Sequence, residues 1–195
     1  MNDDFLQHSE FSAAKIFDFG EFFGDGLSLV KRFPMNISVE KQSGIYILRS
    51  VQVLPVGLDE AWDFFSNPKN LDRITPPDMA FRITNNPPDF TYAGQIITYK
   101  IGIFPLVKSS WVTEITQFDE RRFFVDEQRF GPYAMWHHEH HFREISSGRT
   151  EMQDIVSFKL PLGFLGDLIA GKAVVHRVRY IFENRYRVLR QIFPD

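Results

Sequence analysis

The sequence contains no cysteine among its 195 residues. This absence excludes disulfide bonds, thiolate nucleophiles and cysteine-ligated zinc together. Any metal site in this chain must therefore be built from histidine and carboxylate side chains.

An excess of positive charge and long apolar runs are also absent. The formal net charge of −3 argues against a nucleic-acid partner that is bound through its phosphates. No apolar run approaches the length of a membrane span, so we expect no stable insertion into a membrane. The first residues include Asp3 and Asp4 and lack the apolar segment of a signal peptide. We therefore expect a cytoplasmic protein.

Aromatic residues are abundant instead, at 15% of the chain with 21 phenylalanines. A small core does not need so many, whereas a wide aromatic-lined cavity would use them. Glycine and proline interrupt residues 1–44, which we interpret as an aromatic-rich N-terminal extension that packs on its own domain or forms a homodimer contact. This segment contains seven of the phenylalanines, namely Phe5, Phe11, Phe17, Phe19, Phe22, Phe23 and Phe33.

From residue 45 onward the pattern predicts one strand, two short helices, a series of strands and a long helix. Residues 45–54 are β-branched and apolar, and they predict the first strand. Leu58, Ala61, Trp62 and Phe65 have helical spacing, and Asn67-Pro68 begins a second short helix. The next strand-like segments, separated by turn residues, are 79–84, 95–103, 108–117, 122–129, 133–145 and 149–160. An apolar stripe over 165–193 predicts a long helix that lies against the sheet.

Four histidines lie within residues 136–142, in the penultimate of these strands. With the two-residue period of a strand, His138 and His140 share the apolar face. His137 and His141 lie on the other, mostly polar face, where we expect them to be solvated. The sequence therefore predicts an interior pair of imidazoles.

A hairpin turn at residues 146–148 pairs this strand with the last one. In the register that matches apolar faces, His140 lies opposite Asp154 and Phe142 lies opposite Met152. Directly opposed side chains in a sheet lie close enough to interact. An imidazole and a carboxylate are therefore expected to meet in the interior.

A second turn near residues 130–132 connects the histidine strand to the preceding strand. This turn brings Asp126 within one pair of His138, and it places Phe124 and Gln128 on the same inward face. Two imidazoles and two carboxylates are thus expected to converge on one wall of the interior.

The order of elements and several local strings resemble the START-like (SRPBCC) superfamily of helix-grip proteins, which includes the birch pollen allergen and the polyketide cyclase/dehydrase group. The resemblance covers residues 45–193. Within the superfamily, the strings resemble those of the subgroup described as ligand-binding or cell-division-inhibitor-like. The strings are Trp62-Asp63-Phe64-Phe65 with Asn67-Pro68, Asp126-Glu127-Gln128 with Gly131-Pro132, and Thr150, Met152 and Asp154 with Leu160-Pro161-Leu162-Gly163.

The resemblance implies an α+β helix-grip fold. In this fold a curved antiparallel sheet of about seven strands wraps around a long C-terminal helix, and two short helices follow the first strand. Residues 45–195 would then form a START-like ligand-binding domain. The family implies a cavity for an apolar ligand between sheet and helix, and it implies no particular reaction.

We therefore expect the protein to bind a small hydrophobic or amphipathic molecule, such as a lipid, an isoprenoid or a polyketide-like compound, without a cofactor. One alternative is a cyclase, dehydratase or hydrolase with a His-Asp dyad drawn from His138, His140, Asp126 and Asp154. The other is a structural or regulatory interaction protein without a ligand. The candidate ligand-binding residues are Trp111, Phe124, Asp126, Gln128, Trp136, His138, His140, Phe142, Met152, Asp154 and Phe158.

The His138 and His140 pair also has a spacing that can chelate a metal ion, and Asp126 or Asp154 could complete the ligand set. Both imidazoles already have expected carboxylate partners, so a hydrogen-bonded network accounts for the same residues. On that ground we expect no metal.

Overall fold

The structure, a computed structural model, describes residues 36–104 and 107–194. All of the described elements belong to one compact unit of the chain. In chain order they are β1 (Asn36–Gln42), β2 (Ile45–Leu54), α1 (Leu58–Phe65), η1 (Pro68–Asn70), α2 (Leu71–Ile74), η2 (Pro77–Met79), β3 (Arg82–Ile83), β4 (Ile96–Phe104), β5 (Val107–Asp119), β6 (Phe123–Phe130), β7 (Met135–Ser146), β8 (Arg149–Lys159) and α3 (Phe164–Ile192).

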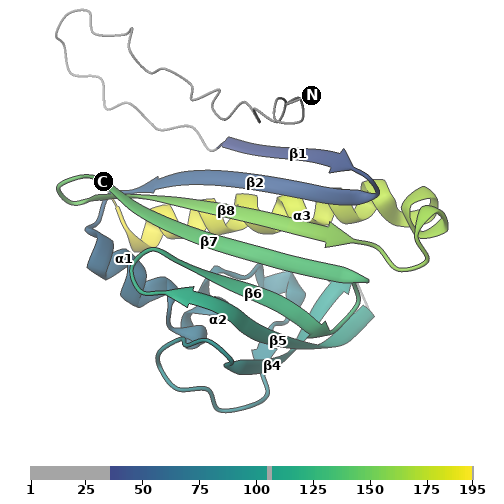
Figure 1. The fold of residues 1–195 in the computed structure, drawn as a ribbon, viewed down its shortest axis with the longest axis horizontal. Coiled ribbons are helices and arrows are strands. Elements are labelled where there is room, and N and C mark those ends of the chain that lie inside the picture. Colours follow the sequence, from purple (N-terminus) through teal and green to yellow (C-terminus); the bar gives the residue numbers. More distant parts are fainter. Residues whose placement is uncertain (1–35, 105–106, 195) are drawn as a thin grey trace, which may run out of the picture. The chain divides into compact units, whose positions relative to one another are not determined.

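The strands of the described residues form one antiparallel sheet of eight strands in the order β1-β2-β8-β7-β6-β5-β4-β3. Helix α3 runs along one face of this sheet, behind β2 and β8 in Figure 1. The predicted α+β class, the curved antiparallel sheet and the long C-terminal helix are confirmed. The short helices follow the second strand of the sheet, because β1 precedes the strand that the sequence predicts as the first.

Strand β1 lies within the segment that the sequence pattern assigns to the N-terminal extension. Its side chains are mostly exposed, and it pairs only with β2, so it carries little of the apolar signal that marks a strand. Ser43 and Gly44 connect the two strands with positive φ angles of 51° and 81°, as a two-residue type I′ hairpin turn requires. Residues 1–35, and with them the expected homodimer contact, lie outside the described residues.

The core has two parts that lie side by side under the sheet. One contains aromatic and aliphatic side chains of α1 and β4 to β8 with the C-terminal end of α3. The other joins β2 and β8 to the middle of α3, where Leu48, Val156, Phe158 and Val178 are completely buried. Along α3 the buried apolar residues recur at helical spacing, at Val174, Val178, Phe182 and Leu189. No helix of the described residues combines the length and apolarity that a membrane span requires.

The first turns of α3 differ from the expected stripe. Leu168, which the pattern places on the buried side, is 72% exposed, and Phe164, Leu165 and Ile169 are exposed with it. The first turn instead contacts the sheet through a polar residue, since Asp167 accepts a hydrogen bond from Nζ of Lys41 in β1. The segment predicted as a strand over 79–84 is also shorter, because η2 ends at Met79 and Ala80 has a positive φ of 43°.

Candidate functional site

A cavity lies between strands β4 to β7 on one side and helices α1, α2 and α3 on the other. The cavity volume is about 150 Å³, several times what one water molecule needs. Most of the lining is apolar and aromatic, including Trp111, Phe124 and Trp136. Asp126, His138, His140, Arg177 and Arg185 supply a set of polar groups to the same lining.

The histidine pair occupies the centre of the sheet, because β7 pairs with β6 on one side and β8 on the other. His138 lies opposite Asp126, and His140 lies opposite Asp154, so both predicted registers are confirmed. The two imidazole rings lie on one face with their centres 3.8 Å apart. The register shifts by one residue only at the turn, where a bulge after Glu144 pairs Ser146 with Arg149.

The hydrogen bonds within this cluster connect diagonal neighbours. Nε2 of His138 lies 2.9 Å from Oδ1 of Asp154, and Nε2 of His140 lies 2.9 Å from Oδ2 of Asp126. The directly opposed groups are also close, with Nδ1 of His138 3.3 Å from Asp126 and Nδ1 of His140 3.0 Å from Asp154. The last contact lacks hydrogen-bond geometry. Each imidazole therefore lies between both carboxylates.

Arg185 of α3 completes the cluster. Its Nη1 donates a hydrogen bond to Oδ1 of Asp154 at 3.0 Å, and its guanidinium lies 4.8 Å from the ring centre of Phe182. Sequence reasoning missed this residue. A signal was present, because Arg185 falls on the helical stripe between Phe182 and Leu189, the side that faces the sheet.

Arg177 is a second basic residue of α3 that contributes to the cavity. Its side chain is only 15% exposed, and it lines the cavity. Its Nη1 donates a hydrogen bond to Oδ2 of Asp78 at 2.7 Å. The ring of Tyr180 accompanies this pair, with its hydroxyl donating to Oδ1 of Asp78.

The electrostatics of the cluster favour charged groups in spite of their burial. Burial alone would raise the pKa of Asp154, but the Arg185 guanidinium, the hydrogen bond from His138 and the nearby ring of His140 hold this pKa well below its usual range. Burial is likewise outweighed at Asp126, whose pKa is lowered by the charge of His138 and by hydrogen bonds from both imidazoles. The charges of two carboxylates, one guanidinium and one imidazolium would then cancel.

His138 is the imidazole for which the structure supports this charge. Burial, the largest single effect, lowers the pKa of His138, while the charge of Asp126 and the hydrogen bonds to Asp126 and Asp154 together raise it above its ordinary value. Both ring nitrogens of His138 lie within 3.3 Å of a carboxylate oxygen, as two N–H donors require.

Six of the predicted site residues line the cavity, and five have other surroundings. Phe142 and Met152 belong to the core beneath α1, and Phe158 belongs to the core beneath α3. Asp154 lies beside the histidines on β8, which contributes nothing to the lining. Gln128 closes the turn before β7, where its side chain bonds both backbone groups of Tyr133. The six residues that line the cavity are Trp111, Phe124, Asp126, Trp136, His138 and His140.

The outward-facing histidines of β7 have separate partners. Nδ1 of His137 lies 2.9 Å from Oε1 of Glu127, and Nε2 of His141 lies 2.9 Å from Oε2 of Glu139. Both rings are partly exposed, which agrees with their predicted position on the polar face.

The fold is shared with solved structures of low sequence similarity. No protein-family model and no curated protein matches the chain. Protein Ms6760 from Mycobacterium smegmatis superposes with a TM-score of 0.58 at 15% identity, over 82% of this chain and 99% of that one. The Zhui aromatase/cyclase from Streptomyces sp. R1128 has a TM-score of 0.55 at 13% identity, over 74% and 91%.

A START superfamily protein from Mycobacterium smegmatis has a TM-score of 0.52 at 11% identity, over 73% of this chain and 98% of that one. At these identities the likeness establishes the fold alone. The chain has a START-like helix-grip fold, as the resemblance of its sequence implies.

Proposed function

We propose that the protein is a cytoplasmic binding protein for a small hydrophobic or amphipathic molecule, which occupies the cavity beneath β4 to β7. The observation that carries this proposal is the composition of the lining, which joins a broad apolar and aromatic wall to a few buried polar groups. Ligand pockets have this composition in general, because apolar walls supply affinity and placed polar groups supply orientation. All lining residues lie between Phe64 and Arg185, within the proposed ligand-binding domain of residues 45–195.

The polar groups of the lining favour an amphipathic ligand that carries a hydrogen-bond acceptor. Nε1 of Trp111 is buried, and within the described residues it has no hydrogen-bond partner. A buried donor without a partner costs about 1–3 kcal/mol, and a ligand oxygen in the cavity would remove this cost. Arg177 adds a positive charge to the same lining.

The geometry supports binding more directly than proton abstraction by a histidine. All four ring nitrogens of His138 and His140 lie within 3.3 Å of a carboxylate oxygen, so each faces a carboxylate and none directs a lone pair at an organic molecule in the cavity. A general base needs such a lone pair within hydrogen-bond reach of the substrate. The cluster is therefore better suited to anchor a polar group than to remove a proton.

The test begins with extraction of the purified protein and mass spectrometry of what is released. A second measurement titrates the protein with the fluorescent probe 8-anilinonaphthalene-1-sulfonate (ANS), with and without the extracted material as competitor. Two adjacent residues of β4 supply matched variants. Ile97 is buried in the cavity wall, while Ile96 is 43% exposed on the other face.

We expect Ile97→Trp to fill the cavity and abolish ANS binding, and we expect Ile96→Trp to leave it unchanged. Both variants must retain the circular dichroism spectrum of the wild type. If no molecule is extracted and ANS binds equally to both variants, the cavity is not a ligand site, and a structural or regulatory interaction role replaces this proposal.

A further inference from the structure

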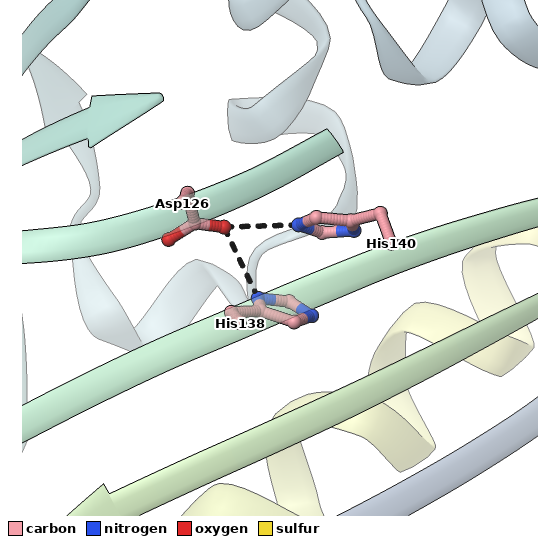
Figure 2. A group of neighbouring side chains, drawn as sticks. All are labelled: Asp126, His138 and His140. Carbon is pink, nitrogen blue, oxygen red and sulfur yellow. Dashed lines mark hydrogen bonds and ion pairs between the residues drawn. The ribbon is translucent and has the colours of Figure 1, made fainter. Parts of the chain in front are cut away.

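Asp126, His138 and His140 bring one possible metal-ligand atom each close together in the lining of the cavity. Figure 2 shows one carboxylate oxygen of Asp126 facing both rings. This oxygen, Oδ2, lies 3.3 Å from Nδ1 of His138 and 2.9 Å from Nε2 of His140. One ligand atom from each of the three residues lies within 4.8 Å of the other two.

The two separations from Asp126 to the imidazoles are close to those around a bound metal ion. Zinc-ligand bonds of about 2.0–2.2 Å in a tetrahedral site place neighbouring ligand atoms about 3.4 Å apart. The contacts at 3.3 Å and 2.9 Å therefore need to open by about 0.1 Å and 0.5 Å, and the two ring nitrogens, which lie within 4.8 Å of each other, need to approach the same spacing.

The other side of each imidazole faces Asp154. Nε2 of His138 lies 2.9 Å and Nδ1 of His140 lies 3.0 Å from Oδ1 of this residue. Histidines that bind metals usually donate their second N–H to a carboxylate, which orients the ring and increases its basicity. Arg185 in turn holds Asp154 in place.

The two carboxylates therefore have different positions, which the sequence leaves open. Carboxylate partners for both imidazoles argue against a metal when their positions are unknown. In the structure one carboxylate lies on the side where the three ligand atoms converge, and the other lies on the opposite side of the rings. With neutral imidazoles, the charges of Asp126, Asp154 and Arg185 leave one net negative charge, which attracts a cation.

We infer that Asp126, His138 and His140 bind a divalent transition-metal ion such as Zn²⁺ or Co²⁺, with Asp154 orienting His138 through a hydrogen bond and lying beside His140. Two imidazoles and one carboxylate suit these ions, and a three-residue set leaves a coordination position open toward the cavity. This site would exist whether or not an organic ligand is bound.

The test uses the full chain, freed of metal with a chelator and then dialysed. Zn²⁺ is titrated by calorimetry, and Co²⁺ is followed by its visible absorption. We expect one ion per chain in the wild type. We expect His138→Ala, His140→Ala and Asp126→Asn each to abolish this binding, and we expect Asp154→Asn to weaken it by roughly 10- to 100-fold.

The opposite face of the same strand supplies the controls, because His137 and His141 have their own carboxylate partners there. His137→Ala and His141→Ala should retain wild-type affinity. NMR signals of the histidine rings test the same distinction in the wild type, without any substitution. Addition of Zn²⁺ should shift the ring signals of His138 and His140 and leave those of His137 and His141 unchanged.

Three results would overturn this inference. The first is the absence of Zn²⁺ and Co²⁺ binding in the wild type. The second is metal binding that is lost in His137→Ala or His141→Ala but kept in His138→Ala. The third is a set of Zn²⁺-induced NMR shifts confined to the outward-facing rings of His137 and His141. ANS binding by the metal-free protein tests the proposed ligand cavity separately, so failure of one proposal is distinguishable from failure of the other.

Discussion

Substitution of Asp154 by asparagine removes one charge from the buried cluster while it preserves the size of the side chain. Asp154 is 3% exposed, and its Oδ1 accepts hydrogen bonds from Arg185 and His138. The amide of asparagine offers no counter-charge to the buried guanidinium. Loss of one partner of a buried ion pair costs about 3–5 kcal/mol, chiefly because the other charge stays buried.

We expect Asp154→Asn to lower the free energy of unfolding by this amount. In a domain of this size, 1 kcal/mol corresponds to about 2–4 °C, so the melting temperature should fall by about 6–20 °C. Urea titration followed by tryptophan fluorescence measures the same change as a lower midpoint with an unchanged slope.

Glu151→Gln is the matched control. Glu151 lies on the outward face of the same strand and pairs with Arg143, whose side chain is 71% exposed. An exposed pair of this kind contributes no more than about 1 kcal/mol. The control should therefore unfold close to the wild type.

A second substitution separates the charge from other effects of the asparagine. In Asp154→Asn/Arg185→Met the unpaired guanidinium is gone, so the double variant should be more stable than Asp154→Asn alone. The reasoning is refuted if Asp154→Asn unfolds within about 1 kcal/mol of the wild type, or if Arg185→Met restores nothing.

The structure makes three further predictions. In metal-free protein the raised pKa of His138 stabilises the fold fully below about pH 6.5 and ceases to do so as pH rises through that raised value. The lowered pKa values of Asp126 and Asp154 stabilise it above about pH 4, and this stability is lost on acidification. Urea midpoints should therefore peak between these limits, and a steady rise from neutral to alkaline pH contradicts this. Phe158→Ala should lower the free energy of unfolding, measured in urea, by about 3–5 kcal/mol, since Phe158 is completely buried in the core. ANS affinity should not change. A loss of ANS binding would place Phe158 in the cavity wall. Arg177→Gln should weaken binding of ANS, which is an anion. Its cost in the free energy of unfolding should be no more than about 1 kcal/mol, because Asp78, the ion-pair partner of Arg177, is half exposed. An unchanged ANS titration counts against a cationic lining.

Most of the fold could be predicted from the sequence because its signals are local. The alternation of apolar residues and the turn residues between segments set the strands from β4 to β8, and the apolar stripe set α3. Strand β1 was not predicted, because it is an edge strand with mostly exposed side chains. Its sequence therefore lacks the apolar alternation that predicts a strand.

The interior pair of histidines could also be predicted from the sequence. The hairpin turn at residues 146–148 determined which residues of β7 and β8 lie opposite one another, so His140 opposite Asp154 followed from local pattern alone. The same period of two separated His138 and His140 from the outward-facing histidines.

Only the tertiary structure decided how these residues are connected. The choice of diagonal over directly opposed hydrogen bonds depends on side-chain rotation, which strand register leaves open. Arg185 and Asp154 are 31 residues apart in the chain. They meet only because α3 packs on the sheet with one particular rotation about its axis and one particular position along the strands. The sequence determined which chemical groups the interior holds, because periodicity is a property of neighbouring residues. Their partners depended on the packing of helix against sheet, because that packing is a property of the whole fold.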